Sequence, residues 1–210
     1  MSKQNRSAPV MQAVLDAVGE RLMRADESLI RIPEICEATG VNYGSVYHHF
    51  GSREGVIDAA YHQMFTKLAQ EDIATLQIVS VTSKTNEEYL VAMQGLIGTF
   101  ASSDERRARR ALRARIVAAS MMRPELRILI GETQSRLTSE LESIVEYGQQ
   151  REWLNRNLSA HSIAVLIQVL LVGRTLDDVS TTPIDNAEWE ASMATLLGVI
   201  LSSPSAESVL

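Results

Sequence analysis

The sequence predicts an all-α protein in which an N-terminal three-helix domain with a helix-turn-helix precedes a larger C-terminal helical bundle, about nine helices in all. Apolar residues recur at helical spacing along most of the chain, and no strand-like alternation stands out. Only five prolines and eleven glycines interrupt 210 residues, which favours long helices over many short strands. Within residues 32–53, Gly and Asn separate two short segments, a pattern typical of two helices joined by a tight turn.

The N-terminal domain is expected over residues 8–68, after a disordered arm at residues 1–7. Its first helix runs from Pro9 to about Arg24, where apolar residues follow helical spacing. Short helices follow at about 33–39 and 43–50, the second of which occupies the recognition position of a helix-turn-helix.

Residues with distinct backbone preferences divide these helices. Gly40 is placed to turn the chain after the second helix, and Asn42 is a favourable N-cap for the third. Gly51 ends the third helix, and Ser52 caps a fourth that continues towards Leu68. The turn and the helix starts are therefore specified locally by the sequence.

The second domain is expected over residues 69–203, with a frayed tail at 204–210. A polar segment at 80–86 predicts a loop, and the apolar periodicity after it predicts amphipathic helices. These helices are expected at about 87–100, 104–122, 124–150, 162–176 and 188–201.

Composition limits the classes of protein. Hydrophobic residues make up 45% of the chain, enough for a buried core, and aromatic residues only 5%. The lone Cys36 excludes an internal disulfide, favours a reducing compartment, and fits a buried small residue better than a redox sensor. No signal-peptide shape and no apolar run of membrane-spanning length stands out, so we expect a cytoplasmic protein with no membrane partner.

The charge distribution restricts how the chain meets nucleic acid. The net charge is −6, and the first 60 residues hold six basic and eight acidic residues, which argues against a nonspecific nucleic-acid coater. The stretch from Ala38 to Ser52, however, holds no Asp or Glu. A polyanion would therefore approach the protein at this acid-free stretch. There, helix N-termini and donor side chains would supply the attraction that a basic surface supplies in other proteins.

The stretch from Ile32 to Ala60 resembles the DNA-binding domain of the TetR family of bacterial transcription regulators. Arg53 stands where that family usually has Lys, and the C-terminal part is similar to the family only in the number and length of its helices. The resemblance is carried, without a gap in spacing, by Ile35, Ala38, Gly40, Val41, Tyr47, His49, Phe50 and Ser52.

The resemblance implies roles for the residues around the turn. The first turn of the recognition helix would face base edges, and residues after it would contact phosphates. Asn42 would cap the helix, touch the DNA backbone, or both, and His48 would pack or face solvent. The predicted DNA-binding residues are Arg31, Asn42, Tyr43, Gly44, Ser45, Tyr47, His49 and Arg53.

Six arginines fall between Arg106 and Arg115, and four of them share one helix face. In one interpretation they form a solvated face paired with Asp104, Glu105 and acids of the next helix. In a second interpretation, one or two guanidinium groups meet an anionic effector or acids of the DNA-binding domain. Contact with DNA is a minor third option, because the family presents only its N-terminal domain to DNA. An effector pocket is predicted from Tyr89, Met93, Phe100, Arg113, Met121 and Met122.

The resemblance also implies a homodimer formed by the last two helices, and an effector-binding role for the C-terminal bundle. The effector is expected to be a largely apolar small molecule, and the arginines leave an anionic group open. The predicted dimer interface consists of Val165, Leu166, Val169, Leu170, Met193, Leu196, Leu197 and Ile200.

Together these features predict a repressor that binds double-stranded operator DNA and is released by an effector. Control by a protein partner and activation in place of repression stay open as alternatives. A helical enzyme is the alternative from another class, but no Ser-His-Asp spacing, P-loop or nucleotide loop occurs. No cofactor is expected, and a metal site from His48, His49 and His62 is disfavoured because adjacent histidines on a helix point apart.

Overall fold

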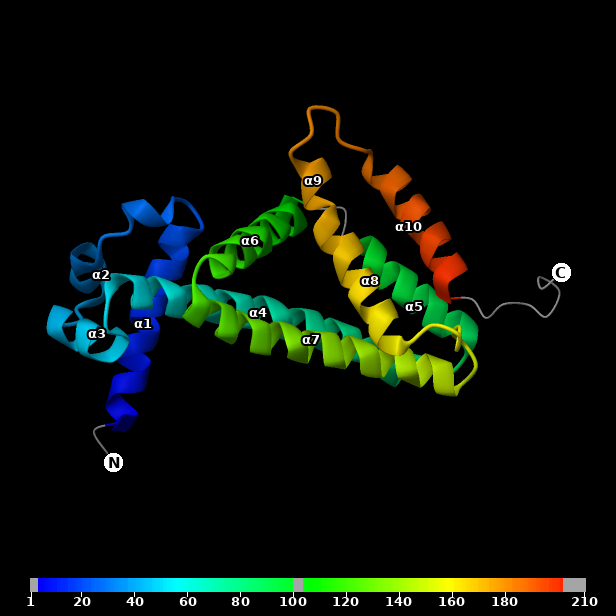
Figure 1. Ribbon diagram of the computed structural model, residues 1–210, viewed down its shortest axis with the longest axis horizontal. Coiled ribbons are helices and arrows are strands. Elements are labelled where there is room, and N and C mark those ends of the chain that lie inside the picture. Colours follow the sequence, from blue (N-terminus) through cyan, green and yellow to red (C-terminus); the bar gives the residue numbers. More distant parts are fainter. Residues whose placement is uncertain (1–3, 100–103, 202–210) are drawn as a thin grey trace. The chain divides into compact units, whose positions relative to one another are not determined.

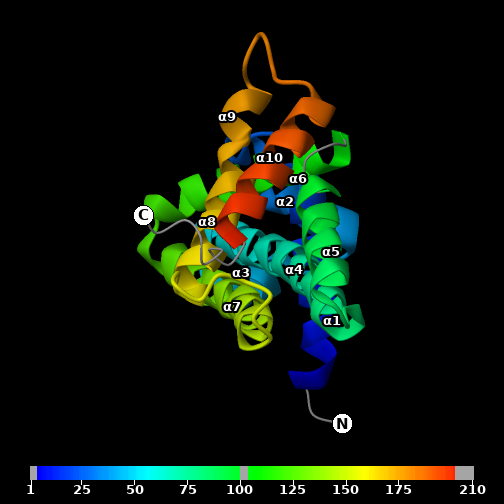
Figure 2. The same cartoon turned by 90° about the vertical axis from the view of Figure 1, so that its right-hand side faces the viewer.

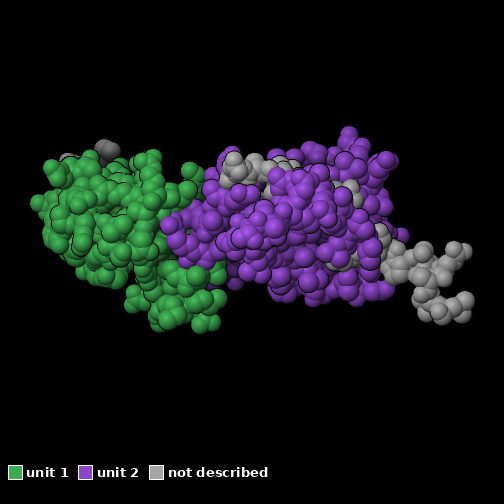
Figure 3. All heavy atoms as spheres, turned by 90° about the horizontal axis from the view of Figure 1, so that it is seen from above, with its two compact units in different colours: residues 1–67, 116–130 green, residues 68–115, 131–210 purple. Residues whose placement is uncertain are grey.

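The computed structural model describes residues 4–99 and 104–201, which fold into helices without any strand in these ranges (Figure 1). The chain divides into two compact units. Unit 1 comprises residues 1–67 and 116–130, and unit 2 comprises residues 68–115 and 131–210, as coloured in Figure 3.

The all-α prediction is confirmed, with nine longer helices and one short one among the described residues. The helices are α1 (Gln4–Leu22), α2 (Ile32–Thr39), α3 (Tyr43–Phe50), α4 (Arg53–Thr82), α5 (Asn86–Thr99), α6 (Asp104–Met121), α7 (Pro124–Gln150), α8 (Ala160–Gly173), the four-residue α9 (Thr175–Asp178) and α10 (Asn186–Leu201), with a 3-10 turn, η1 (Glu27–Leu29), before α2.

The core of unit 1 is formed by the apolar faces of its helices. Val14 and Val18 of α1 are fully buried, as are Ile35 of α2 and Val46 of α3. α1 packs against α2, and α2 packs against α3. The helical start at Gln4 lies within residues 1–7, where a disordered arm was predicted, so the prediction is wrong from Gln4 onward.

α4 is longer than the sequence indicated. It continues past Leu68 to Thr82 and so covers the first part of the predicted loop at 80–86. No Gly or Pro stands between Gly55 and Thr82 to break the helix. The hydroxyl of Thr82 donates to the carbonyl of Ile78, so it is satisfied within the helix.

The core of unit 2 gathers residues from α5, α7, α8 and α10. Tyr89 of α5 is fully buried, and its hydroxyl donates to the carbonyl oxygen of Ile144 at 2.9 Å. Burial raises the pKa of this phenol. Gly148 allows α7 to come this close, because a Cβ there would lie 2.8 Å from Leu154 and 3.2 Å from Tyr89.

The segment from Ala160 to Asp178 is long and apolar enough to cross a membrane by length and composition, although no such run was expected. Only 28% of the segment is buried within its own chain. Asp178 at its end is ion-paired with Arg110, which fits a helix packed in a protein bundle. The segment therefore presents an exposed apolar surface.

Candidate nucleic-acid interface

The turn between α2 and α3 depends on Gly40. This residue has φ = +68°, a left-handed conformation that glycine adopts without steric cost. Its N–H and the N–H of Val41 both donate to the carbonyl of Cys36. These bonds end α2 and redirect the chain into α3, as the sequence predicted.

Asn42 caps the recognition helix. Its side-chain oxygen accepts hydrogen bonds from the backbone N–H groups of Gly44 at 2.8 Å and Ser45 at 3.3 Å. A Cβ on Gly44 would lie 3.1 Å from that oxygen, so a small residue fits tightly beside the cap. The capping role predicted for Asn42 is confirmed, and its amide oxygen is occupied within the helix.

α3 presents most of its surface outward. Val46 is its one buried residue, and Tyr43, Gly44, Ser45 and His49 are exposed. Tyr43 is 48% exposed even though it is a large aromatic residue. The first turn therefore offers aromatic, hydroxyl and backbone groups with no carboxylate among them, which suits contact with base edges.

Tyr43 and Tyr47 form a pair one turn apart on α3. Their ring centroids are 4.5 Å apart, with an interplanar angle of 38°. The hydrogen bond with Tyr43, together with partial burial, raises the pKa of Tyr47. His49 instead packs edge-on against Phe50, with centroids 4.6 Å apart.

A tight junction connects α3 to α4. Gly51 has φ = +79°, and the Ser52 hydroxyl accepts from the N–H of Gly55 at 2.9 Å, confirming the predicted break and cap. A Cβ on Gly55 would lie only 2.1 Å from the carbonyl oxygen of Phe50. The angle between α3 and α4 thus depends on a glycine that the sequence pattern did not single out.

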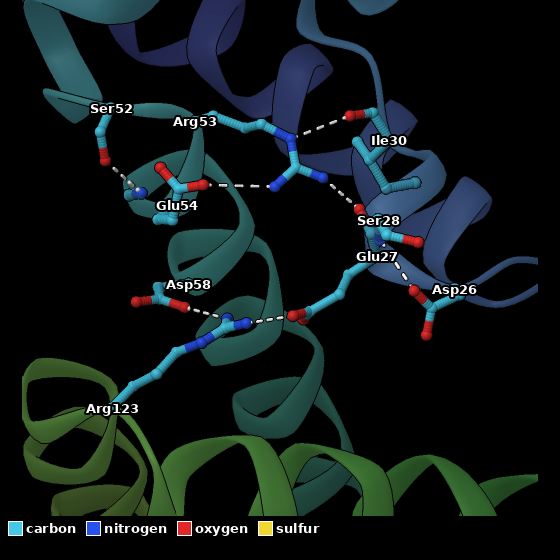
Figure 4. A network of polar contacts seen from close by, with 10 residues as sticks. Asp26, Glu27, Ser28, Ile30, Ser52, Arg53, Glu54, Asp58 and Arg123 are labelled. Atoms are coloured by element: carbon cyan, nitrogen blue, oxygen red, sulfur yellow. Dashed lines mark hydrogen bonds and ion pairs between the residues drawn. The ribbon is translucent and has the colours of Figure 1, made fainter.

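Arg53 has a different environment from the one expected for a phosphate contact. Its Nε donates to the carbonyl of Ile30 at 3.1 Å, and its NH2 donates to the carbonyl of Glu27 (Figure 4). Its NH1 donates to the carboxylate of Glu54 at 3.3 Å. All three nitrogens therefore have partners within unit 1, so the guanidinium ties the start of α4 to η1, and the phosphate contact of Arg53 stays a prediction.

Arg123, between α6 and α7, reaches the same turn from another side. Its guanidinium donates to the carboxylates of Glu27 and Asp58, the latter at 2.6 Å (Figure 4). Burial of Arg123 works against its charged form, but the hydrogen bonds with these carboxylates outweigh it and raise the pKa of the guanidinium. Glu27 is thus held through its backbone by Arg53 and through its side chain by Arg123.

Arg31 stands at the N-cap of α2. Its side chain is exposed and makes no capping hydrogen bond. Cys36 is buried in α2, and burial raises the pKa of its thiol, which disfavours the reactive thiolate. Among the residues that the structure describes, no group of His, Cys, Asp and Glu side chains is arranged to hold a metal ion.

The predicted effector pocket is not assembled as the sequence suggested. Tyr89 and Met93 lie in the packed core of unit 2, whereas Met121 and Met122 belong to unit 1 and are strongly exposed, Met122 at 84%. Met121 and Met122 are thus exposed residues of unit 1, and the predicted role of these methionines in an effector pocket stays a prediction. Phe100 lies outside the described residues.

The arginines of α6 pair with acids that sequence reasoning did not identify. Arg109 and Arg113 donate to the carboxylate of Asp72 on α4, and Arg109 also reaches Glu71. Arg110 makes a two-pronged ion pair with Asp178, at 2.8 and 2.7 Å. The paired interpretation is supported, but its acids lie far away in the sequence, and Arg113 is not a free effector ligand.

The predicted dimer interface divides into exposed and buried residues. Val165, Leu166 and Val169 of α8 and Leu196 of α10 are exposed, and Leu170 is half-buried. Met193 and Leu197 are wrong as interface residues, because they are buried in the core of their own unit. The side chain of Ile200 lies outside the described residues.

Further exposed apolar residues extend this surface. Val172 continues the exposed row of α8, and Val199 is exposed on α10; Leu176, on α9, is also exposed. α8 and α10 are labelled in the two views of Figures 1 and 2. We call the exposed set the α8–α10 face: Val165, Leu166, Val169, Val172, Leu196 and Val199.

Comparisons with known proteins agree with this geometry. Residues 30–60 match the family described as bacterial regulatory proteins, tetR family. No curated protein matches the chain. Among solved structures, a TetR-family transcriptional regulator from Cytophaga hutchinsonii is 18% identical with a TM-score of 0.70, covering 96% of this chain and 98% of that one.

Two other solved structures are also similar. Salmonella enterica GusR is 19% identical with a TM-score of 0.65, covering 92% of this chain and 95% of its own. A protein from Saccharomonospora viridis, solved in complex with choline, is 15% identical with a TM-score of 0.70, covering 92% of this chain and 98% of its own. At these identities the similarity shows a shared fold.

Proposed function

We propose that this chain, which belongs to the TetR family of bacterial transcriptional regulators, is a homodimeric repressor released from its operator by a small-molecule effector. The observation that carries the DNA-binding part is the capped, acid-free and outward-facing α3. Its one buried residue, Val46, anchors the helix and leaves the first turn available to DNA. A helix presented in this way fits the major groove.

Contacts to bases and contacts to phosphates fall to different residues. Tyr43 and Ser45 are exposed at the start of α3, where a hydroxyl donates to or accepts from base edges. Tyr47, His49 and Arg31 offer donors to phosphates. Because the domain as a whole is not basic, affinity for nonspecific DNA is expected to be low, and a second protomer is needed for tight binding.

The α8–α10 face supports the homodimer. Aliphatic side chains at three- and four-residue spacing on α8 form an apolar stripe that is not covered by the chain itself. A soluble protein rarely leaves such a contiguous stripe exposed. A second copy of the same face would cover it and place two recognition helices on one side of DNA.

An effector role rests on the fold and on the connections within the helices. The structural neighbour solved with choline supports a small-molecule site in a fold of this kind. α4, α6 and α7 each begin in one unit and end in the other, so a ligand held in unit 2 acts on continuous helices. Arg123 then connects the α6–α7 corner to η1 and α4 inside unit 1.

The test is binding of the full chain to duplex DNA selected from a random pool, with fluorescence anisotropy as the readout. Tyr43→Ala is expected to relax base preference at one or two positions, whereas His48→Ala leaves preference unchanged. An unchanged preference for Tyr43→Ala would remove α3 as the reader. A chain that sediments as a monomer would instead assign the α8–α10 face to a different protein partner.

A further inference from the structure

Arg174 is a buried arginine that forms no ion pair with an acid among the described residues. It lies between α8 and α9 and is only 5% exposed. Arginine is seldom buried in proteins unless it is paired with an acid. The other arginines near it follow this rule, because Arg110 is bound to Asp178.

The contacts of Arg174 leave part of its guanidinium unused. NH2 donates to the side-chain oxygen of Asn186, a neutral group at the start of α10. The guanidinium carbon also lies 5.1 Å from the centre of the Trp189 ring. Nε and NH1 have no hydrogen-bond acceptor within the part of the chain that the structure describes.

Within the described residues, the two nearby carboxylates bond to groups other than Arg174. Both oxygens of Asp177 accept from the backbone N–H of Ile184, at 3.2 Å. Asp178 accepts the two-pronged bond from Arg110 and lies 3.5 Å from Arg107. Two arginines, Arg107 and Arg110, therefore share the carboxylate of Asp178. Burial and the repulsion from Arg110 lower the pKa of Arg174, which shows how weakly its charge is compensated.

Two further donors close to Arg174 in the fold also lack acceptors. The hydroxyl of Thr175, the next residue in the chain, is buried without a partner in the described residues. The indole N–H of Trp189, whose ring lies against the guanidinium, is in the same state. A cation, an indole N–H that can only donate and a hydroxyl thus call for a ligand rich in acceptors and negatively charged.

We infer that Arg174, Thr175 and Trp189 form a binding site for a small oxyanion, the carboxylate or phosphate group of a ligand, between the α8–α9 junction and the first turn of α10. The claim that the effector is an anion bound at this site rests on the proposed function. The claim that an anion binds at this site does not. The cationic residue selects an anion, the opposite charge from the choline found with the structural neighbour. The site also replaces Arg113, whose guanidinium is already bound to Asp72.

The first experiment measures anion binding to the full chain in the absence of DNA. Benzoate and inorganic phosphate are the probes, with chloride as the reference, and isothermal calorimetry and thermal melting are the readouts. Arg174→Met removes the charge at similar length. Arg151→Met is the matched control, since that arginine is exposed and stacks on Tyr147, with 3.7 Å to the ring centre.

The expected result is saturable binding of at least one probe, weakened about 30-fold or more by Arg174→Met and unchanged by Arg151→Met. Thr175→Val, which removes only the hydroxyl, should weaken binding by a smaller factor. A preference for benzoate assigns a carboxylate ligand, and a preference for phosphate assigns a phosphorylated one. Absence of binding, or equal binding by Arg174→Met, would overturn the inference.

A second arm separates this site from the proposed function. The probe that binds is added to the complex of the chain with its selected DNA, and release of the DNA is followed by anisotropy. Release by the wild type, but not by Arg174→Met, supports an effector role. Binding of the probe with no effect on DNA retains the anion site and contradicts its role as the effector site. If Arg174→Met does not fold, Arg174→Lys is used in its place. This variant keeps the charge and is expected to weaken binding of the probe less than Arg174→Met would.

Discussion

The first turn of α3 and the α8–α10 face are both uncovered by their own chain, but their chemistry is opposite. Tyr43, Gly44 and Ser45 present hydroxyl, aromatic and backbone groups without an acid. Val165, Val169 and other aliphatic residues of the α8–α10 face present no polar side-chain atom. A hydrated polyanion suits the first surface, and a second apolar protein surface suits the other.

The two surfaces also differ in what holds them in place. α3 is fixed by local devices: the Asn42 cap, the left-handed Gly40, and the Gly55 contact. α8 is held by its buried side, where Ile163 and Ile167 join the core of unit 2. The position of α3 therefore depends on single backbone positions, whereas the position of α8 depends on its buried side chains.

The largest expected effect is on the apolar face. Val169 is 58% exposed in one protomer, so Val169→Glu is tolerated by the folded chain but places a charge in the proposed dimer interface. We expect a monomer in sedimentation and a loss of operator affinity of about 100-fold or more. The matched control is Val91→Glu, at an exposed residue of α5, which should stay dimeric. A dimeric Val169→Glu would place the interface elsewhere.

The next effect is on the α3 side. Gly55→Ala brings a Cβ against the carbonyl of Phe50, and the backbone must shift. We expect a loss of about 2 kcal/mol or more in the free energy of unfolding, measured by denaturant titration. Gly131→Ala in α7 is the control, since nothing lies within 4 Å of its Cβ, and it should be neutral or stabilising. Equal stability of the two variants would show that the α3–α4 junction is not rigid.

Tyr43→Ala is expected to have a smaller effect, confined to DNA recognition. Loss of a base contact should cost about 1–3 kcal/mol against the preferred sequence and little against mismatched ones. Anisotropy with a panel of single-base operator variants measures the difference. The thermal stability should change little, because the side chain is half exposed. A uniform loss over the whole panel would make Tyr43 a phosphate contact.

Tyr47→Phe has the smallest expected effect. It removes one hydroxyl and keeps the ring that packs against Tyr43. We expect binding to weaken by about 0.5–1.5 kcal/mol at all sequences alike, because a hydrogen bond to a phosphate carries no sequence information. Measuring the affinity of Tyr47→Phe for the same panel of single-base operator variants checks this. A sequence-dependent loss would contradict the division of roles within α3.

Sequence reasoning succeeded where the determinants are local. Gly40, Asn42 and Ser52 act on residues within five positions of themselves, so their roles follow from residue type and spacing. Arg53 and Arg113 were assigned to ligands because their partners, Glu27 and Asp72, are distant in the chain. The choice of acid by an arginine is set by tertiary packing, which a single sequence does not display.

The face that a helix buries was also harder to predict than its existence. α10 carries apolar residues on two sides: Met193 and Leu197 point into the core, whereas Leu196 and Val199 are exposed. Apolar spacing alone does not distinguish these sides, so buried and exposed residues were grouped as one interface. The site at Arg174 could not be predicted for a related reason, since nothing in its local sequence shows that this arginine is buried.

Selection of duplex DNA by the full chain from a random pool tests the central claim most directly, since it examines both surfaces at once. A dimer with two copies of α3 predicts an inverted repeat whose half-sites lie about one helical turn, roughly 34–36 Å, or somewhat more apart. Val169→Glu should lose the repeat. Enrichment of no sequence, or of a single unrepeated site by the wild type, would contradict the account.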